Sequence, residues 1–428
     1  MTARPPVYVH PSQLQIGVYV YLDLGWMDHP FTLSHFRIKN DEQLTQLLRL
    51  GLDKVRIDPE RSTQPPRALV VAAVPPTAPA ATMVEAEPSP ALIAKRQRIE
   101  RLKAQRAALA QCEKRYLDAA RTINSISRNL IALPQESIAD AQALTEQLAQ
   151  SLLRESEVVI HLMNDKVMGE DVYYHSLNVA MLAMITGRAM HLGENELQQL
   201  GMGGIFHDLG KSRIPHKVLI KADKPNKAEA DFLQMHVAYG LDIAGKVQLP
   251  AAVIQMIAQH HEYMDGSGYP KGLTAAAIDP HSRILAAVNA YDNLCNPVQA
   301  IHALTPHEAL SLMFSQQRRR WDGEVLSTLI HTLGVYPPGT IVRLNNDNLG
   351  MVVSVNPAKP IKPQVLVYDP STPREEAIIL DLTEDDELSI SKALRPAQLP
   401  TAVYDYLSPR TRVTYFFYGK GARAGSGA

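Results

Sequence analysis

The stretch that decides the fold is a histidine pair followed at once by a glycine-rich loop. It reads His260-His261-Glu262-Tyr263-Met264-Asp265-Gly266-Ser267-Gly268-Tyr269-Pro270. A second motif lies upstream and reads His207-Asp208-Leu209-Gly210-Lys211. Together the motifs supply imidazoles, a carboxylate that can bridge two cations, and an ammonium group, which are the parts needed to cleave a phosphodiester with bound metals. The sequence therefore indicates a metal-dependent phosphohydrolase.

Two further segments carry candidate metal ligands. Asp171 and His175 stand four residues apart on a predicted helix, so their side chains project from the same face. His236 lies on a predicted helix over 226–246, where a lone histidine is more often a packing residue. The His260-His261 pair shifts the balance toward a ligand role for His236.

Imidazole and carboxylate ligands without a thiolate suit Mn, Fe, Ni or Zn. Two such ions about 3.5–4 Å apart can acidify a bridging water and stabilise charge on phosphate oxygens. Lys211 could contact a phosphate oxygen or protonate the leaving alkoxide, and its alternative is a solvated surface lysine. Gly268 and Pro270 permit a tight loop that approaches a ligand, whereas Tyr269 contacts the ligand or only packs.

Composition excludes several classes of protein. The 428 residues include 43 Lys and Arg against 44 Asp and Glu, so no overall field attracts bulk nucleic acid. Only Cys112 and Cys295 occur, which gives no disulfide framework. The N-terminus lacks a signal-peptide pattern, and no apolar run approaches the roughly 20 residues that span a bilayer. We expect a cytoplasmic protein without membrane insertion.

The sequence predicts a mainly α protein: an all-helical metal-binding core with a small α+β domain before it and a small β-rich appendage after it. Apolar residues recur at helical spacing through the core, and strand-like runs follow Pro337-Pro338-Gly339. The predicted divisions are an N-terminal domain (1–64), a Pro/Ala-rich linker (65–90), a connecting helix (91–134), the core (135–335), the appendage (336–418) and a disordered tail (419–428).

The two motifs, taken together, resemble those of the HD-GYP division of the HD phosphohydrolase superfamily. The resemblance covers roughly 135–333, and 7–57 resembles the small domain of unknown function that often precedes such cores. It implies hydrolysis of the bacterial second messenger cyclic di-GMP to pGpG, GMP or both by a metal-activated hydroxide. It also implies a role in the signalling that controls biofilm formation and motility.

The resemblance further implies the ligand set. One metal is held by His175, His207 and Asp208, and Asp208 bridges to a second metal held by His236, His260 and His261. The ions are expected to be iron or manganese. Asp171 occupies the place where some members carry a glutamate that recruits a third metal, so two or three ions are open at this point.

Two departures from the family pattern bear on activity. Asn289 stands where an aspartate ligand is common, which predicts weaker binding of one metal, and Leu294-Cys295-Asn296-Pro297-Val298 replaces an arginine-containing element that contacts guanine or phosphate. An alternative function is therefore a weakly active or inactive core that binds cyclic di-GMP or a protein. Another cyclic dinucleotide as substrate is a third hypothesis.

Partners beyond the substrate are less directly indicated. The charged, Ala- and Leu-rich segment that begins at Ser89-Pro90 is typical of a long helix, and such a helix could pair with its copy in a homodimer. Diguanylate cyclases, which make the messenger, are further expected partners of a protein that resembles this family.

Overall fold

The chain folds into two compact units, each with its own apolar core. The computed structural model describes residues 6–24, 29–31, 34–68, 90–154, 158–162, 171–221, 226–355, 358–370, 372, 374, 377–409 and 413–419. The first unit lies within 1–106 and 369–378, and the second within 107–368 and 379–428. Among the described residues, none of the helices combines the length and the apolar character that a membrane span requires.

The first unit contains the predicted α+β domain. Its antiparallel sheet has the strand order β1 (Val7–Val9), β4 (Val55–Ile57), β2 (Tyr19–Tyr21) and β3 (His35–Arg37). Helix α1 (Asp41–Leu48) begins after Asn40, whose side chain accepts a hydrogen bond from the Gln43 amide. The apolar residues that face inward, Val18, Val20, Ile38, Leu47 and Val55, are buried and form the core.

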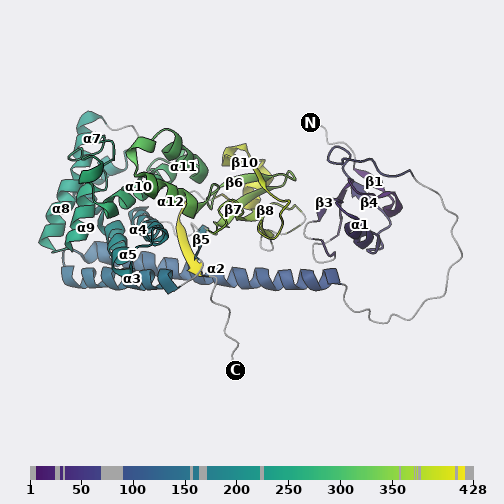
Figure 1. Cartoon of the computed structure of the whole chain (residues 1–428), viewed down its shortest axis with the longest axis horizontal. Helices are drawn as coiled ribbons and strands as arrows, with labels where there is room; N and C mark the ends of the chain where they lie inside the picture. The colour runs from purple at the N-terminus through teal and green to yellow at the C-terminus, as the bar shows by residue number, and fades with distance from the viewer. Residues whose placement is uncertain are drawn as a thin grey trace, which may run out of the picture. The chain divides into compact units, whose positions relative to one another are not determined.

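The second unit is mainly helical, as predicted (Figure 1). From residue 107 on, it includes α2 (Pro90–Asn129). Its other helices are α3 (Pro134–Arg154), α4 (Asp171–Ala189), α5 (Glu194–Phe206), α6 (His216–Leu219), α7 (Lys227–Gln234), α8 (His236–Lys246), α9 (Ala251–Gln259), α10 (Pro280–Cys295), α11 (Pro306–Ser315), α12 (Gly323–Leu333) and α13 (Thr401–Leu407). Short 3₁₀ turns join them: η3 (Leu209–Arg213), η4 (Ala275–Ala277), η5 (Ala300–His302), η6 (Arg318–Arg320) and η8 (Pro396–Gln398).

Helices α4 and α5 form the centre of this helical core. Every residue from 176 to 185 is buried, and α5 is buried from 200 to 206. A helix that is apolar on all sides must be covered on all sides, and α4 contacts α3, α5, α10 and α12. The candidate ligands on α4 and at the end of α5 therefore lie in the interior of the unit.

A second sheet packs beside the helices. Its main strand order is β10 (Ile390–Leu394), β6 (Ile341–Leu344), β7 (Leu349–Val355), β5 (Val158–Leu162) and β11 (Tyr415–Gly419). Strand β8 (Gln364–Val367) pairs with β7 and with β9 (Ile379–Asp381). All of these pairs are antiparallel. This sheet accounts for the β character predicted after residue 336.

Three details differ from the sequence-based expectations. The predicted helix over 226–246 is two helices, because the chain turns at Met235 between α7 and α8. The predicted all-helical core contributes strand β5, and β11 extends through Gly419, beside β5 in Figure 1. The sheet thus joins segments from both predicted regions. This pairing could not be predicted, because strands so far apart in the sequence leave no local signal of their contact.

Other expectations fall on residues that the structure does not describe. Most of the predicted linker lies at 69–89, and the predicted disordered tail, apart from Gly419, lies at 420–428. The long helix expected to begin at Ser89-Pro90 is α2, which begins at Pro90; Ser89 itself is outside the described residues.

Candidate metal centre

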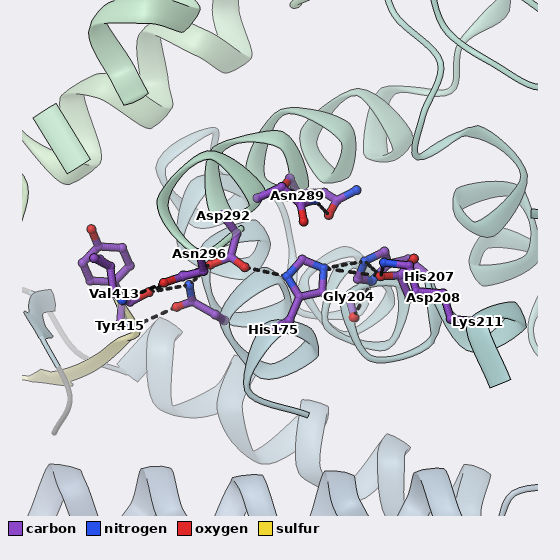
Figure 2. A network of polar contacts seen from close by, with 12 residues as sticks. His175, Gly204, His207, Asp208, Lys211, Asn289, Asp292, Asn296, Val413 and Tyr415 are labelled. Atoms are coloured by element: carbon purple, nitrogen blue, oxygen red, sulfur yellow. Dashed lines mark hydrogen bonds and ion pairs between the residues drawn. The ribbon is translucent and has the colours of Figure 1, made fainter. Parts of the chain in front are cut away.

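Four helical segments bring the candidate ligands together. His175 lies on α4, His207 and Asp208 follow α5, His236 opens α8, and His260 and His261 follow α9. Figure 2 shows His175, His207 and Asp208 pointing toward one another. Side chains on or next to packed helices are held more precisely than side chains on loops, so this placement restricts where the imidazoles point.

Gly210 is needed for this arrangement. A Cβ at position 210 would lie 1.9 Å from the His236 carbonyl oxygen and 2.4 Å from the Gly240 amide nitrogen. Only glycine lets η3 approach α8 this closely. The approach places Asp208, which precedes η3, beside His236 at the start of α8.

Asp208 lies between two groups of histidines. Its Oδ2 is 3.4 Å from His175 Nε2 and 3.2 Å from His207 Nε2. Its Oδ1 is 3.5 Å from His236 Nε2 and 3.8 Å from His260 Nε2. One carboxylate therefore faces two sites with different oxygens, which is the geometry of a bridging ligand.

The ligand atoms form two groups with metal-ligand spacing. Within each group, the nitrogen and oxygen atoms all lie within 4.8 Å of one another. The groups are His175, His207 and Asp208, and Asp208, His236, His260 and His261. Asp208 belongs to both groups.

Hydrogen bonds to backbone carbonyls fix the proton on Nδ1 in three of the imidazoles. The Nδ1 atom lies 2.9 Å from the Gly204 carbonyl oxygen in His207, 2.6 Å from that of Leu233 in His236, and 2.8 Å from that of Ile257 in His260. A carbonyl only accepts, so each Nδ1 carries the proton and donates. When such a ring is neutral, its Nε2 lone pair faces the centre, as in metal-ligating histidines.

This arrangement fits a cation. His236 Nε2 and His260 Nε2 are 3.1 Å apart, and His175 Nε2 and His207 Nε2 are 3.2 Å apart. Two bare lone pairs at that distance would repel each other, so each pair of nitrogens needs a proton or a metal ion between or beside them. Asp208 Oδ1 is also buried without a hydrogen-bond partner, and a buried carboxylate oxygen is costly when nothing pairs with it.

The pKa shifts favour neutral imidazoles in the second ligand group and an ionised Asp208 carboxylate. Burial lowers the pKa of His236, and burial together with neighbouring imidazoles lowers the pKa of His260 and His261 well below the usual range. These rings are therefore neutral near pH 7. Burial also raises the pKa of Asp208, but His207 and Lys211 outweigh it and hold that pKa well below the usual range.

His175 responds in the opposite sense. Burial lowers its pKa, but hydrogen bonds to Asp208 and Asp292 outweigh burial and raise the pKa to about 9. A raised imidazole pKa means that its surroundings favour positive charge. The same two carboxylates would favour a metal ion at this position.

Lys211 lies beside the bridging carboxylate. Its Nζ is 2.5 Å from Asp208 Oδ2, and its side chain is 32% exposed, against 4% for Asp208. The lysine thus connects the buried centre to solvent.

The loop after the histidine pair covers the second group. The Tyr269 ring stacks on His261 with centroids 4.5 Å apart and planes at 21°, and the Tyr269 amide donates to the His261 carbonyl at 3.0 Å. Buried Glu262 accepts hydrogen bonds from the amides of Lys271 at 2.7 Å and Leu273 at 2.8 Å. The loop is therefore tied to the residues that carry the ligands.

Gly268 and Pro270 complete this loop. A Cβ at position 268 would lie 2.4 Å from the His261 carbonyl oxygen, so a larger residue would push the loop away from the pair. Pro270 is exposed and follows a cis peptide bond.

The two ligand groups defined above include neither Asn289 nor Asp171. Asn289 is buried on α10, and its Oδ1 accepts a hydrogen bond from Asn293 Nδ2 at 2.8 Å. Asp171 is the first residue of α4, but its side chain is outside the described part of the chain.

The residue that orients His175 is Asp292, which was not among the predicted site residues. Asp292 Oδ2 accepts from His175 Nδ1 at 2.5 Å, and Asp292 is 1% exposed. Its position three residues after Asn289 on the same helix was a usable signal. Asn178 and Asn296 donate hydrogen bonds to Asp292, but nothing comparable in the sequence pointed to these two asparagines.

This fold and site define a helical domain with clustered histidines and an aspartate that could hold divalent metal ions. Residues 132–325 match the family model described as HD domain, and the chain therefore contains an HD domain. Residues 7–141 match a domain of unknown function, DUF3391, and residues 341–402 match a KOW domain associated with HD domains.

Several known proteins are similar to this chain. A cyclic di-GMP phosphodiesterase of Pseudomonas aeruginosa is 28% identical over 377 residues, which cover 86% of this chain and 85% of that protein. The 3'3'-cGAMP-specific phosphodiesterase 1 of Vibrio cholerae is 29% identical over 165 residues, or 38% of each chain. A solved structure of an HDG"Y"P protein from Bdellovibrio bacteriovorus is 15% identical with a TM-score of 0.42, covering 76% of this chain and 98% of that one.

Proposed function

We propose that this protein is a metal-dependent phosphodiesterase that hydrolyses cyclic di-GMP to pGpG, GMP or both. The observation that carries the proposal is Asp208, whose two oxygens face two separate groups of histidines. The similarity to the Pseudomonas enzyme, which extends over most of both chains, supports the choice of substrate. Because this substrate is a messenger inside bacterial cells, the proposed place of action is the cytoplasm.

The proposed ligands divide between the two halves of the centre. His175, His207 and Asp208 would hold one ion, and Asp208, His236, His260 and His261 would hold the other. Bound divalent ions supply an acidified water and neutralise charge on the phosphate oxygens. We propose iron or manganese, because nitrogen and oxygen ligands without a thiolate suit these metals.

Two further side chains are proposed as ligands. Asn289 would contribute its amide oxygen to the half that contains His175, since it occupies the place of a common aspartate ligand. Two or three ions remain open; Asp171, one helical turn before His175, is the proposed ligand if metal analysis finds a third ion.

Lys211 is proposed to act on the substrate. Its ammonium group lies at the solvent side of Asp208 and can donate a hydrogen bond to a phosphate oxygen. The same group can give a proton to the leaving alkoxide. Both roles require the position beside Asp208 that the lysine has.

The loop that contains Gly268, Tyr269 and Pro270 is proposed to contact the substrate. Burial raises the pKa of Tyr269, so its hydroxyl keeps its proton at physiological pH and remains a hydrogen-bond donor. Stacking on His261 holds the ring next to the proposed second ion.

The direct test is turnover of cyclic di-GMP by protein loaded with Mn²⁺ or Fe²⁺. We expect pGpG or GMP as product, and we expect His207→Ala combined with Asp208→Ala to abolish turnover. His216→Ala is the matched control, because His216 is an exposed histidine on α6 outside both ligand groups. Turnover that survives the double substitution would refute the proposal.

A second candidate function is a weakly active or inactive receptor for cyclic di-GMP. Two features favour it: Asn289 in place of a charged ligand, and Leu294-Cys295-Asn296-Pro297-Val298 in place of an arginine-containing element. Calorimetry distinguishes the two, since a receptor binds cyclic di-GMP tightly and yields no product over hours with any metal.

The choice of base is tested by a substrate panel. The Vibrio cholerae relatives named as specific for 3'3'-cGAMP match only part of this chain, at 28–29% identity. We propose cyclic di-GMP as the preferred substrate, and comparable rates on both dinucleotides would contradict this preference.

We also propose a homodimer through α2 and interaction with diguanylate cyclases. The 40-residue length of α2 supports the dimer, because isolated long helices gain stability by burying a face against a partner. Light scattering at micromolar concentration tests it, and a monomeric mass would contradict it. Co-purification with a diguanylate cyclase tests the second partner.

A further inference from the structure

Hydrogen bonds extend from the candidate metal centre to the C-terminal strand of the chain. Asp292 forms the link: one oxygen contacts His175, and the other is held by two asparagines (Figure 2). The proposed function gives these asparagines no role. Both contact the backbone at Val413, almost at the end of the described chain.

Asn178 is the first of these asparagines. It lies on α4, three residues after His175, and is 1% exposed. Its Nδ2 donates to Asp292 Oδ1 and, at 3.2 Å, to the Val413 carbonyl. Its Oδ1 accepts from the Tyr415 amide at 2.8 Å.

Asn296 makes a matching set of contacts from the end of α10. Its Nδ2 donates to Asp292 Oδ1 and to the Val413 carbonyl, both at 2.8 Å. Its Oδ1 accepts from the Val413 amide, also at 2.8 Å. Asp292 and the backbone at 413–415 are thus joined twice by amide groups.

The backbone contacts determine the orientation of both amides. A backbone carbonyl only accepts and a backbone amide only donates, so each Nδ2 must face Val413 O and each Oδ1 must face a backbone N–H. Either amide flipped would lose its hydrogen bonds. Both Nδ2 groups are therefore directed at Asp292, which leaves its other oxygen for His175.

The C-terminal strand is itself held firmly. Strand β11 pairs with β5 from Tyr415 through Gly419, and the Tyr415 hydroxyl lies 2.8 Å from that of Tyr291. The Cys112 thiol on α2 donates to the Phe417 carbonyl at 3.5 Å. The backbone that the asparagines contact is therefore a fixed support.

We propose that the segment Val413–Tyr415, through Asn178, Asn296 and Asp292, positions the imidazole of His175 for metal binding. The inference rests on the proposed metal centre. Asp292 fixes the ring orientation and keeps the Nδ1 proton in place, so Nε2 faces His207 and Asp208. Partners of this kind typically change metal affinity by about 10- to 100-fold.

The proposal makes the two halves of the centre unequal. The half that contains His175 depends on the C-terminal strand, whereas His236 and His260 are oriented by carbonyls of their own helical segments. Loss of the asparagine contacts should therefore lower the affinity for one ion and leave the affinity for the other unchanged.

The test is a Mn²⁺ titration, by calorimetry, of full-length protein freed of metal with a chelator. Asn296 is only partly buried, so Asn296→Ala should fold, which circular dichroism checks. We expect it to bind one of two Mn²⁺ ions about tenfold more weakly and the other normally. Asn345→Ala is the matched control, because Asn345 also bridges backbone groups, Glu387 and Ser389, but away from the centre.

A second measurement needs no variant. Coupling between sites is reciprocal, so Mn²⁺ should also stabilise the strand. We expect Mn²⁺ to slow amide hydrogen exchange in the peptide that contains 413–419 of the wild-type protein. The proposal would be overturned if Asn296→Ala lowered the affinity for both ions equally or changed neither affinity. It would also be overturned if Mn²⁺ left the exchange rate of the 413–419 peptide unchanged. A wild-type protein that binds no Mn²⁺ would overturn the proposed function as well.

Discussion

Asn289 is a proposed metal ligand that carries no charge. It is buried on α10, the helix that also carries Asp292, and its amide oxygen already accepts from Asn293. A carboxylate could accept the same hydrogen bond and would add a negative charge that a cation can neutralise. The wild-type residue therefore favours weaker metal binding, which bears on whether the protein is a fast enzyme or a receptor.

The first prediction concerns this charge. We expect Asn289→Asp to bind one Mn²⁺ about tenfold more tightly, since ligand charge sets affinity for divalent ions. We also expect the metal-free variant to be less stable than wild type, because a buried charge without a partner is costly. Calorimetry and urea unfolding measure the two effects. Asn345→Asp adds the same charge away from the centre and should leave metal affinity unchanged. Unaltered metal affinity in Asn289→Asp would contradict its proposed ligand role.

The second prediction separates chemistry from metal binding. Lys211→Met keeps the apolar stem and removes the ammonium group that lies 2.5 Å from Asp208 Oδ2. We expect kcat to fall about 100-fold, as when one charge-stabilising donor is removed from an active site. The metal content should stay unchanged, because an ammonium group is not a ligand. Lys217→Met, an exposed lysine on α6, is the control, and full activity in Lys211→Met would show that this lysine is only a surface residue.

At this scale, the sequence indicated most of the residues that cluster. The motifs at 207–211 and 260–270 identified His207, Asp208, His260 and His261 because each motif places several reactive groups close together in sequence. Asn178, Asn296 and the backbone of Val413 were not predicted. Their contacts join positions more than 100 residues apart, and asparagine has many ordinary structural uses.

At the scale of elements, the loop after the histidine pair depends on one buried carboxylate. Glu262 is 2% exposed and accepts two backbone hydrogen bonds from the far side of the loop. These bonds hold the loop in the position where Tyr269 stacks on His261. The loop is therefore rigid in a way that its glycines alone would not provide.

The third prediction tests this rigidity. Glu262→Gln has the same shape, but its NH₂ group would face a backbone amide in place of an acceptor. We expect the free energy of unfolding to fall by about 1–3 kcal/mol and KM for cyclic di-GMP to rise. Urea unfolding and steady-state kinetics check this, with Asp265→Asn as a control at an exposed position of the same loop. Unchanged stability and KM would mean that Glu262 does not hold the loop.

Elements also show where pattern-based prediction stops. The mainly helical core and the β-containing domains on either side of it were predicted, because apolar spacing is a local property. Strand β5 was missed inside the helical region, and β11 pairs with it across more than 250 residues. The break between α7 and α8 was also missed, although it is what places His236 at the start of a helix.

At the scale of the whole molecule, metal binding should act on folding. The proposed ligands lie on α4, just after α5, at the start of α8 and just after α9, so an ion would join segments that span most of the helical core. An ion that binds only the folded state stabilises it by mass action. The buried, unpaired Asp208 Oδ1 indicates that the metal-free centre carries an energetic cost that an ion would remove.

The fourth prediction follows from this linkage. At a free Mn²⁺ concentration 100 times Kd, we expect each ion to add about 2.7 kcal/mol to the free energy of unfolding. The Tm of chelator-treated protein should rise by several degrees on adding Mn²⁺ and fall again with excess chelator. Differential scanning calorimetry measures the change. Ca²⁺, which prefers oxygen ligands, is the control ion, and an equal rise with Ca²⁺ would point to a different kind of site.

The most direct test of the central claim is cyclic di-GMP turnover measured as Mn²⁺ or Fe²⁺ is titrated into metal-free protein under anaerobic conditions. The geometry around Asp208 predicts no turnover without metal and a rise in rate that levels off only after two equivalents per chain have been added. Turnover by the metal-free protein, or a plateau reached at one equivalent, would contradict a centre in which one carboxylate serves two ions.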